Sequence, residues 1–385
     1  MTDRLYFTDA YLTAFEGTVE SVEGTRVRLN KTAFYPTSGG QQFDLGTLGG
    51  VRVVEVIDED AGIMHLLESA PSFAVGATVK GAVDWKRRFD HMQQHTGQHL
   101  LSALFEDLLK AKTASVHFGA DSATVDIEVE SVTRTEAIRI ETRANQIVAE
   151  NRAVSVAFED AATASGLRKP SDRTGEIRIV SIAEIDRSAC GGTHVRATGE
   201  IGGVLIRKLE KYKKQTRVEF ICGARAIARA RADYEALTGI AAVLSTGIDE
   251  VPTLVASQNE SLRAMESEKR KLVESLAAYR AREHYDATAP SAADVRWIVV
   301  SAAPEELRAL ATAITSLPKA AFIGSCESPN TIVFAASEDS GLNAGALLKP
   351  ALAAHGGRGG GNQKVAQGTA PDATALRAIV AILTG

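Results

Sequence analysis

The sequence predicts a multidomain α+β protein built from four successive parts. Residues 1–85 hold short runs in which polar and β-branched residues alternate between glycine-containing turns, as in antiparallel strands. Residues 86–223 combine such runs with two stretches of helical periodicity, and residues 224–286 are charged and nearly free of glycine and proline after Pro252. With 385 residues, 45% of them hydrophobic, the chain is long enough for two or three separate cores.

The first part, residues 1–85, is expected to form a small β-barrel. Its strand-like runs are residues 18–22, 26–29 and 51–56. Several short strands separated by glycine turns are typical of a small antiparallel barrel. Residues 34–42 are polar and contain two adjacent glycines, and turn propensity alone assigns them to a plain loop between strands.

The second part, residues 86–223, is expected to be an α+β domain whose helices cover one face of a sheet. Apolar residues recur at helical spacing through residues 89–105 and again through residues 133–150, and neither stretch contains a proline. The strand-like runs of this part are residues 114–119, 123–129, 177–182, 204–206 and 218–221.

The third part, residues 224–286, is expected to be a helical hairpin or a short coiled coil. Met265, Leu272 and Tyr279 repeat at a spacing of seven residues, which is the spacing of a coiled-coil seam. Lys269 interrupts one seam, and heptads this few leave open whether the helices pair within one chain or between two.

The fourth part, residues 290–385, is expected to be a compact α/β domain. Strand-like runs at residues 297–300, 320–323 and 331–336 alternate with helical stretches. The glycine run at residues 356–361 is not a P-loop, because no Gly-Lys-Ser/Thr follows it and a helix rather than a strand precedes it. Composition alone predicts a flexible loop there.

His91, His95 and His99 lie four residues apart in the predicted helix. Each step of four residues turns an α-helix by about 40°, so the three imidazoles share one face. Cys190 and His194 form a second pair, on a loop whose two glycines permit a tight turn. A thiolate with imidazoles favours Zn²⁺ over Ca²⁺ or Mg²⁺, which prefer oxygen ligands. We predict one zinc ion per chain on His95, His99, Cys190 and His194. A fourth imidazole is not needed, so His91 is left out.

The spacing excludes several kinds of zinc chemistry. No glutamate follows the first ligand His95, so the metalloprotease helix H-E-x-x-H is absent. The P-C-x-x-C sequence of the cytidine deaminases is also absent, and the histidine pair lies too far upstream of the cysteine for a nucleic-acid-reading finger. A closed structural site and an open catalytic site both remain compatible with four candidate ligands.

Bulk composition bounds the cellular setting. The net charge of −5 excludes a protein that binds nucleic acid through overall positive charge, so such binding would need local basic patches. No apolar run approaches the roughly 20 residues that span a bilayer, and the first residues do not resemble a secretory signal. The three cysteines are far apart in sequence, which suits a reducing compartment. A cytoplasmic protein with no membrane partner is expected.

Five segments of the chain resemble one protein family. This family comprises the editing domain of alanyl-tRNA synthetases and its free-standing relatives, the AlaX trans-editing proteins. The two metal-binding motifs carry the resemblance first, at residues 95–102 and 190–194. Residues 34–41 resemble the glycine motif of the longer AlaX proteins, which replaces the plain-loop interpretation of that segment. Residues 217–223 resemble the strand that closes the editing domain, and residues 355–368 resemble the glycine-rich signature of the C-terminal domain of alanyl-tRNA synthetases.

The resemblance implies a deacylase that hydrolyses mischarged Ser-tRNA(Ala), with Gly-tRNA(Ala) as a second candidate substrate. The zinc positions of the family correspond to the four ligands already predicted. No part of the chain resembles an aminoacylation domain, so an editor acting in trans is expected. Two other functions remain open: an RNA-binding protein with a structural zinc, and a zinc hydrolase of another ester.

The resemblance also implies which residues bind the substrate. The candidates to recognise the serine hydroxyl or orient water are Gln41, Gln98, His117 and Thr124, and Gly39 and Gly40 are further candidates for the pocket. The candidates for contacts to tRNA are Arg87, Arg88, Lys211, Lys213, Lys214, Arg358 and Lys364. The helical and C-terminal parts are candidates for homodimer contacts.

Overall fold

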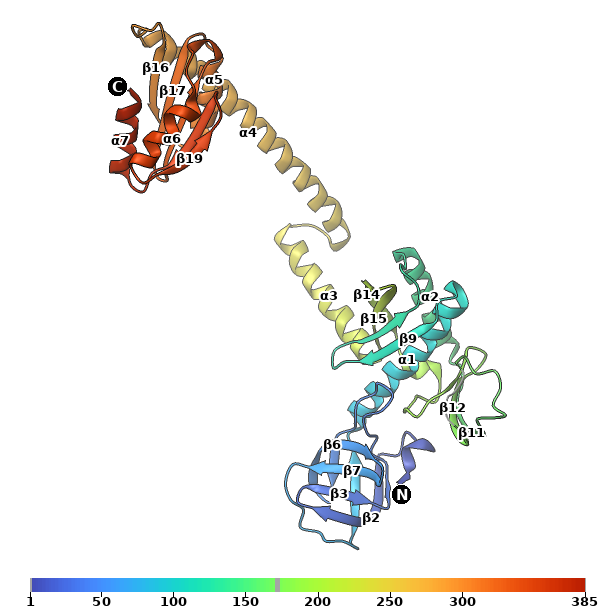
Figure 1. The fold of residues 1–385 in the computed structure, drawn as a ribbon. Helices are drawn as coiled ribbons and strands as arrows, with labels where there is room; N and C mark the ends of the chain where they lie inside the picture. The colour runs from blue at the N-terminus through green and yellow to red at the C-terminus, as the bar shows by residue number, and fades with distance from the viewer. Residues whose placement is uncertain (1, 170–173, 385) are drawn as a thin grey trace. The chain divides into compact units, whose positions relative to one another are not determined.

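The computed structural model describes residues 2–169 and 174–384. Within these residues the chain is a mixed α+β protein with several sheets and seven α-helices, which confirms the predicted class (Figure 1). Its internal contacts divide it into two compact units, Met1–Ile240 and Ala241–Gly385.

Six strands near the N-terminus close into a barrel in the order β2-β3-β7-β6-β5-β8. Alternate residues face its interior, as in β3, where Val27 and Leu29 are fully buried between half-exposed neighbours. The strands of the barrel are β2 (Ala14–Glu23), β3 (Arg26–Leu29), β5 (Gly46–Leu48), β6 (Val51–Glu59), β7 (Gly62–Leu67) and β8 (Thr78–Val83). A short parallel pair, β1 (Asp3–Arg4) and β4 (Lys31–Thr32), lies outside the barrel.

Helix α1 (Trp85–Leu109) begins directly after the barrel and carries the predicted histidines. Asp84 caps its start by accepting a hydrogen bond from the backbone N–H of Arg87. Most of the helix is buried, because α2 (Arg134–Glu150) and a four-stranded sheet in the order β14-β15-β10-β9 pack around it. The strands of this sheet are β9 (Thr113–Phe118), β10 (Ala123–Ile127), β14 (Val204–Tyr212) and β15 (Gln215–Cys222).

A second sheet, in the order β11-β12-β13, positions the cysteine loop. Its strands are β11 (Val154–Asp160), β12 (Glu176–Ile182) and β13 (Asp186–Ala189), all antiparallel. Cys190 follows directly on β13, so the end of this strand determines where the loop begins. Sequence periodicity predicted β12 but neither of its two partners.

The charged segment is helical, as predicted, and consists of α3 (Gly223–Val243) and α4 (Val251–Ala287). The pairing of these helices as a hairpin or coiled coil stays a prediction. Among the described residues, no single helix has the length and apolar character to cross a membrane, although the bent pair Gly223–Val243 and Ile248–Ala287 meets those criteria jointly.

The second unit is built on a five-stranded sheet in the order β16-β17-β18-β20-β19. Alternation along β17 sends Ile323 to one face, against α6 and α7, and Phe322 to the other, against α5 and the end of α4. The elements of this unit are β16 (Arg296–Ser301), α5 (Pro304–Thr315), β17 (Ala320–Glu327), β18 (Asn330–Ala336), α6 (Ala344–Ala354), β19 (Arg358–Gly361), β20 (Val365–Thr369) and α7 (Ala373–Thr384).

The glycine run that composition assigned to a loop forms the strand β19, paired with β20. A Cβ atom on Gly361 would lie 2.3 Å from the carbonyl oxygen of Val365, and one on Gly368 of β20 would lie 2.3 Å from the side chain of Leu352. The glycines therefore allow helix α6 and the two strands to pack closely. Composition alone could not reveal this, because the atoms that exclude a side chain come from other segments.

Candidate metal centre and adjoining cavity

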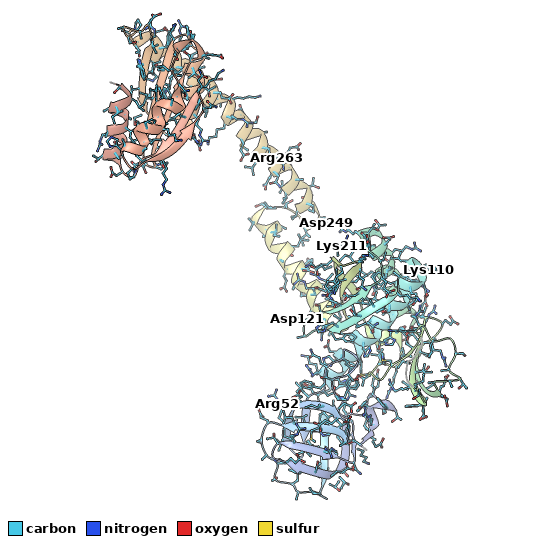
Figure 2. All side chains as sticks on the ribbon, in the orientation of Figure 1. Arg52, Lys110, Asp121, Lys211, Asp249 and Arg263 are labelled. Carbon is cyan, nitrogen blue, oxygen red and sulfur yellow. The ribbon has the colours of Figure 1, made fainter. Side chains whose placement is uncertain are left out.

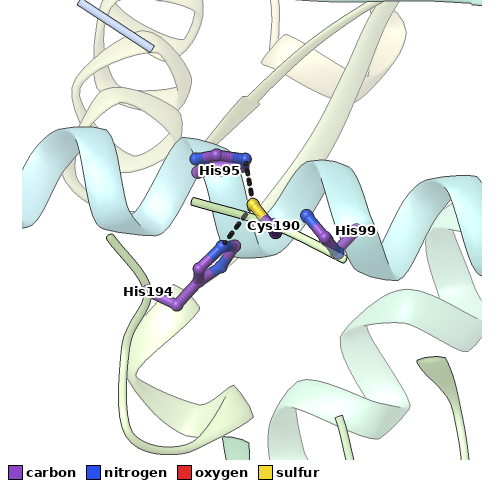
Figure 3. A group of neighbouring side chains, drawn as sticks. All are labelled: His95, His99, Cys190 and His194. Carbon is purple, nitrogen blue, oxygen red and sulfur yellow. Dashed lines mark hydrogen bonds between the residues drawn. The ribbon is translucent and has the colours of Figure 1, made fainter. Parts of the chain in front are cut away.

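The structure brings the four predicted metal ligands together. His95 and His99 lie one turn apart on α1, and Cys190 and His194 come from the loop after β13 (Figure 3). One ligand atom from each residue can be chosen so that all four lie within 4.8 Å of one another. The Sγ atom of Cys190 lies 3.4 Å from Nε2 of His95 and 3.3 Å from Nε2 of His194. No other such group of histidine, cysteine and carboxylate ligands occurs in the described part of the chain.

The ring of His95 is held by the glycine motif. Its Nδ1 lies 2.9 Å from Oε1 of Gln41, which leaves Nε2 to face Cys190. The same Gln41 oxygen accepts the backbone N–H of Thr193 at 3.1 Å, and the Gln41 amide donates to the Thr193 hydroxyl at 2.8 Å. Gln41 was predicted to contact substrate. It joins the two halves of the metal centre and orients one ligand, and its contact with substrate stays a prediction.

The other two imidazoles are oriented in the same way. Nδ1 of His99 lies 2.8 Å from the carboxylate of Asp186, and Nδ1 of His194 lies 3.1 Å from the hydroxyl of Thr96. Every histidine of the cluster thus has a partner on Nδ1 and keeps Nε2 for a metal, the arrangement that metal-binding histidines normally show. The sequence reasoning missed Asp186, although a carboxylate four residues before a ligand cysteine was a usable signal.

Electrostatics in the cluster favour an anionic cysteine. Burial alone would raise the pKa of Cys190, but electrostatic interactions and hydrogen bonds with His95 and His194 bring it well below the usual value. Burial and the nearby His95 lower the pKa of His194 to about 3. Burial opposes protonation of His99, yet Asp186 and the Cys190 thiolate raise the pKa of His99 to about 10. Cys190 is therefore a thiolate and His99 carries a proton, and a bound divalent cation would displace that proton.

Two further residues shape the cysteine loop. A Cβ atom on Gly192 would lie 2.1 Å from Cε1 of His95, so no larger residue fits there without moving the ligand ring. The buried Arg178 of β12 donates to the carbonyl oxygens of Cys190 at 2.7 Å and Gly192 at 2.9 Å. These two contacts hold the loop against the second sheet. The sequence reasoning identified the glycine but not the arginine.

His91, which the sequence analysis set aside, does not belong to the cluster. It lies one turn before His95 and is buried. Burial first, and the Arg87 charge second, lower the pKa of His91 to about 4, so the ring is neutral at pH 7. Its Nδ1 has no hydrogen-bond partner within residues 2–169 and 174–384.

A cavity of about 880 Å³ adjoins the metal centre, and His99 and Cys190 both line it. Of the predicted pocket residues, Gln98 and Gly39 line this cavity as well. Gly40 packs beside Phe118 and Val116, with a positive φ of 85°. A cavity of this size is in the range of small-molecule and cofactor sites.

His117 and Thr124 face each other across β9 and β10. His117 is exposed and Thr124 is half-buried, and neither is among the residues that line the cavity beside the metal centre. Their role in substrate binding stays a prediction.

Three family models match separate parts of the chain. The Threonyl and Alanyl tRNA synthetase second additional domain matches residues 177–219, which include the cysteine loop. The model for tRNA synthetases class II (A) matches residues 9–87, and the DHHA1 domain matches residues 295–385.

Two archaeal relatives match over larger spans. Alanyl-tRNA editing protein AlaX-L of Pyrococcus horikoshii is 31% identical over 289 residues, which cover 71% of this chain and 70% of that protein. Alanyl-tRNA editing protein AlaX-M of Methanosarcina mazei is 37% identical over 237 residues, which cover 56% of this chain and 94% of that protein. The chain belongs to the AlaX family of alanyl-tRNA editing proteins.

The matched domains fit the long form of AlaX, which confirms the predicted resemblance. Alanyl-tRNA editing protein Aarsd1 of Danio rerio is 33% identical over 242 residues, which cover 61% of this AlaX chain. The AlaX chain spans 58% of the length of that relative.

One predicted RNA contact of this AlaX chain is wrong. Arg88 is fully buried, its guanidinium pairs with the carboxylate of Asp44, and it donates to the carbonyl oxygens of Ala10 at 2.7 Å and Ala33 at 2.6 Å. It therefore cannot reach RNA, and it instead links α1 to the N-terminal segment. The neighbouring Arg87 is half-buried and donates to the carbonyl oxygen of Phe43 at 2.9 Å.

The other predicted RNA contacts of the AlaX chain lie on its surface. Lys211, Lys213 and Lys214 are exposed at the turn between β14 and β15, where Lys211 is labelled in Figure 2. Arg358 is exposed on β19, and Lys364 is exposed and lies 3.3 Å from a carboxylate oxygen of Glu338. Their contact with RNA stays a prediction.

Proposed function

We propose that this AlaX chain is a zinc-dependent deacylase that hydrolyses the ester of mischarged Ser-tRNA(Ala), with Gly-tRNA(Ala) as a second candidate substrate. The observation that carries the proposal is the position of His99 and Cys190, which belong to the four-residue cluster and also line the cavity of about 880 Å³. A metal centre that adjoins a cavity is the arrangement a catalytic site requires. The printed names of the relatives, alanyl-tRNA editing proteins, supply the substrate class.

Zinc is the metal that these donors suit best. One thiolate and three imidazoles, each oriented through Nδ1, form a donor set typical of Zn²⁺ and atypical of Mg²⁺ or Ca²⁺. When bound, zinc would supply Lewis-acid polarisation at the cavity wall. Gln41, Asp186 and Thr96 would keep the three imidazoles aimed at the metal.

The chain's own cavity side chains suit the charged end of a tRNA. Lys112, Arg168 and Lys169 line the cavity, as do the carboxylates of Glu106, Glu128 and Asp186. Lys112 and Lys169 would attract the backbone phosphates next to the aminoacylated terminal nucleotide, whereas the charge of Arg168 is paired with Glu106, Asp107 and Asp186. The Arg168 side chain, which is 18% exposed, is held in place by Asp186, with Nε 2.8 Å from the carboxylate.

We also propose that a second copy pairs through α4. Leu262, Met265, Leu272, Leu276 and Tyr279 leave more than half of their surface exposed along this helix. By contrast, Ala277 and Ala281, near the end of the helix, are buried against α5. An apolar seam of this kind is covered by pairing in coiled coils. Molar mass from light scattering should be twice that of the chain, and Leu272→Glu should give the monomer.

Ester loss is the experiment that tests the deacylase. Purified protein is incubated with Ser-tRNA(Ala), Gly-tRNA(Ala) and Ala-tRNA(Ala), and the expected result is hydrolysis of the mischarged species with Ala-tRNA(Ala) left intact. Four protein ligands are also the number in a closed structural site. If Ser-tRNA(Ala) persists while one zinc is bound per chain, the RNA-binding alternative replaces the deacylase.

A further inference from the structure

The sheet β14-β15-β10-β9 has one face in the core and a second face that points away from α1. Val125 of β10 and Val218 of β15 are fully buried in the core that also contains the apolar residues of α1. Side chains alternate along a strand, so their neighbours Asp126 and Arg217 point to the second face. Asp126 and Arg217 lie directly opposite each other in the antiparallel pair of β10 and β15.

A row of polar contacts crosses this second face, from the cavity beside the metal centre to the β14–β15 turn. It begins at Ser115 of β9, which lines the cavity and donates its hydroxyl proton to the Asp126 carboxylate at 2.6 Å. The same carboxylate accepts two hydrogen bonds from Arg217, at 2.7 and 2.8 Å. The guanidinium of Arg217 packs against the ring of Tyr212, with Cζ 4.1 Å from the ring centre. Neighbouring strands are about 4.8 Å apart, so Arg217 lies roughly 10 Å from the strand that borders the cavity.

Tyr212 presents an aromatic ring on a fixed support. Two parallel hydrogen bonds to one carboxylate set the plane of the Arg217 guanidinium, and Asp126 is only 3% exposed, so the support is anchored in the sheet. The Tyr212 side of the contact is open to solvent, because 38% of this residue is exposed. A ring held in this way loses little conformational freedom when another planar group stacks on it.

The surroundings of the ring are basic. Glu210, on the same strand, is paired with Lys208, which also lies opposite Glu219. The turn beside Tyr212 adds three exposed cations, Lys211, Lys213 and Lys214. Nζ of Lys213 lies 5.3 Å from the centre of the Tyr212 ring. An exposed aromatic ring among exposed lysines is the combination with which proteins bind single-stranded nucleic acid, because the ring stacks on a base while the cations attract the backbone.

We propose that Tyr212, packed on Arg217, is a stacking platform for an unpaired base near the 3′ end of the tRNA. The inference rests on the proposed deacylase function and extends it to the nucleotides that precede the aminoacylated one. The 3′ end of a tRNA is single-stranded, and unpaired bases stack on tyrosine rings and on guanidinium planes. With the ester in the cavity, the row from Ser115 to Tyr212 leads the strand across the sheet to the platform. The sequence reasoning included the turn lysines but not Tyr212.

The test separates stacking on a base from attraction to phosphates. The probe is an uncharged hairpin RNA with the acceptor stem and single-stranded 3′ end of tRNA(Ala), and a matched RNA lacks the bases of the unpaired nucleotides before the terminal adenosine. Fluorescence anisotropy gives Kd for wild type, Tyr212→Ala and Tyr212→Phe. We expect Tyr212→Ala to weaken binding of the intact RNA roughly 5- to 100-fold, the size of one lost base–aromatic stack, and Tyr212→Phe to bind nearly as wild type. With the abasic RNA the three proteins should bind alike.

The chain offers a matched control in Tyr234 of α3. This tyrosine is 54% exposed, and Cζ of Arg231 lies 5.5 Å from its ring centre, so Tyr234→Ala also removes an exposed ring beside an arginine. It should leave both Kd values unchanged. In turnover of Ser-tRNA(Ala), Tyr212→Ala should raise KM by the factor seen in binding and leave kcat nearly unchanged. Zinc content and the unfolding midpoint show whether each variant is folded.

The outcomes distinguish the platform from the deacylase. If folded Tyr212→Ala binds the intact RNA as tightly as wild type, the platform is overturned, and the exposed ring would then suit a protein partner instead. An equal loss of affinity for the intact and the abasic RNA would overturn it too, because the ring would then act on something other than a base. If wild type shows base-dependent binding that Tyr212→Ala removes, yet hydrolyses no mischarged tRNA, the platform stands and the deacylase fails.

Discussion

The carboxylate of Asp186 accepts a hydrogen bond from Nδ1 of His99 at 2.8 Å. Its other oxygen lies 2.8 Å from Nε of Arg168, a residue of the cavity wall. One buried carboxylate thus connects a metal ligand to a cation that faces the cavity. A carboxylate on the outer nitrogen of a ligand histidine fixes the ring and increases its basicity, so Asp186 should influence metal affinity without contacting the metal.

We expect Asp186→Asn to weaken zinc binding roughly 10- to 100-fold, because the neutral amide holds the His99 ring less firmly. Competition with a chromogenic chelator measures the affinity. The control is Asp121→Asn, which removes the same charge from an exposed position far from the ligands in sequence. Equal affinity for the Asp186→Asn variant and wild type would show that Asp186 does not orient His99.

Removing two ligands should abolish stoichiometric metal binding. The double variant His95→Ala, Cys190→Ala keeps only two of the four donors, and two donors do not hold zinc against dialysis. Elemental analysis should give close to one zinc per chain for wild type and for the control His355→Ala, and far less for the double variant. Normal zinc content in the double variant would disprove the ligand assignment.

His65 should make the protein less stable in mild acid. It is fully buried in the barrel between the Thr32 hydroxyl at 2.8 Å and the Val27 carbonyl at 3.1 Å, and burial lowers its pKa to about 4. The unfolded chain, with a pKa of about 6.5, takes up the proton first as pH falls. Stability is therefore complete above about pH 6.5 and declines towards pH 4, by about 3 kcal/mol in total.

Urea unfolding of wild type and His65→Gln between pH 7.5 and 4 measures this effect. Glutamine retains hydrogen-bonding groups but does not titrate in this range, so the stability curve of the variant should be flatter. Parallel curves for the two proteins would show that His65 is not the source of the acid sensitivity.

Thr133 should stabilise the start of α2. Its hydroxyl accepts the backbone N–H of Glu136 at 3.2 Å, and the Glu136 carboxylate accepts the backbone N–H of Thr133 at 2.8 Å, which forms a capping box. We expect Thr133→Ala to lower the free energy of unfolding by about 1 kcal/mol and Thr133→Ser to lower it much less. Equal losses in both variants, measured by urea unfolding, would exclude a capping role for the hydroxyl.

The lysines at the β14–β15 turn should contribute to tRNA affinity through charge. The triple variant replaces Lys211 and Lys214 with glutamine and Lys213 with asparagine, because Lys213 has a positive φ of 58° that asparagine tolerates. Binding should weaken, and the dependence of affinity on salt should become less steep because fewer counterions are released. The matched control replaces the exposed Lys31, Lys80 and Lys349 with glutamine. Identical salt slopes in the two triple variants would exclude a contact at the turn.

Local patterns were enough to predict much of the secondary structure and all four candidate ligands. The spacing of four between His95 and His99 already places both rings on one helix face, because helical periodicity is a property of neighbouring residues. Cys190 and His194 were predictable for the same reason, since their pairing depends on a five-residue loop. The strand β19 was not predicted, because its glycines are required by close contacts with Leu352 and Val365, which belong to other elements.

The sequence by itself therefore determined which side chains could bind a metal and to which family the chain is similar. The tertiary structure alone decided how its polar residues are used. Arg88 looked like part of a basic surface, yet Asp44 pairs with it in a fully buried site. Gln41 orients His95, and Ser102 and Thr113 form a hydrogen-bonded pair on the cavity wall, and neither arrangement could be predicted from the sequence. A hydrogen bond depends on atoms that meet in space, and only folding brings such distant segments within 3 Å of one another.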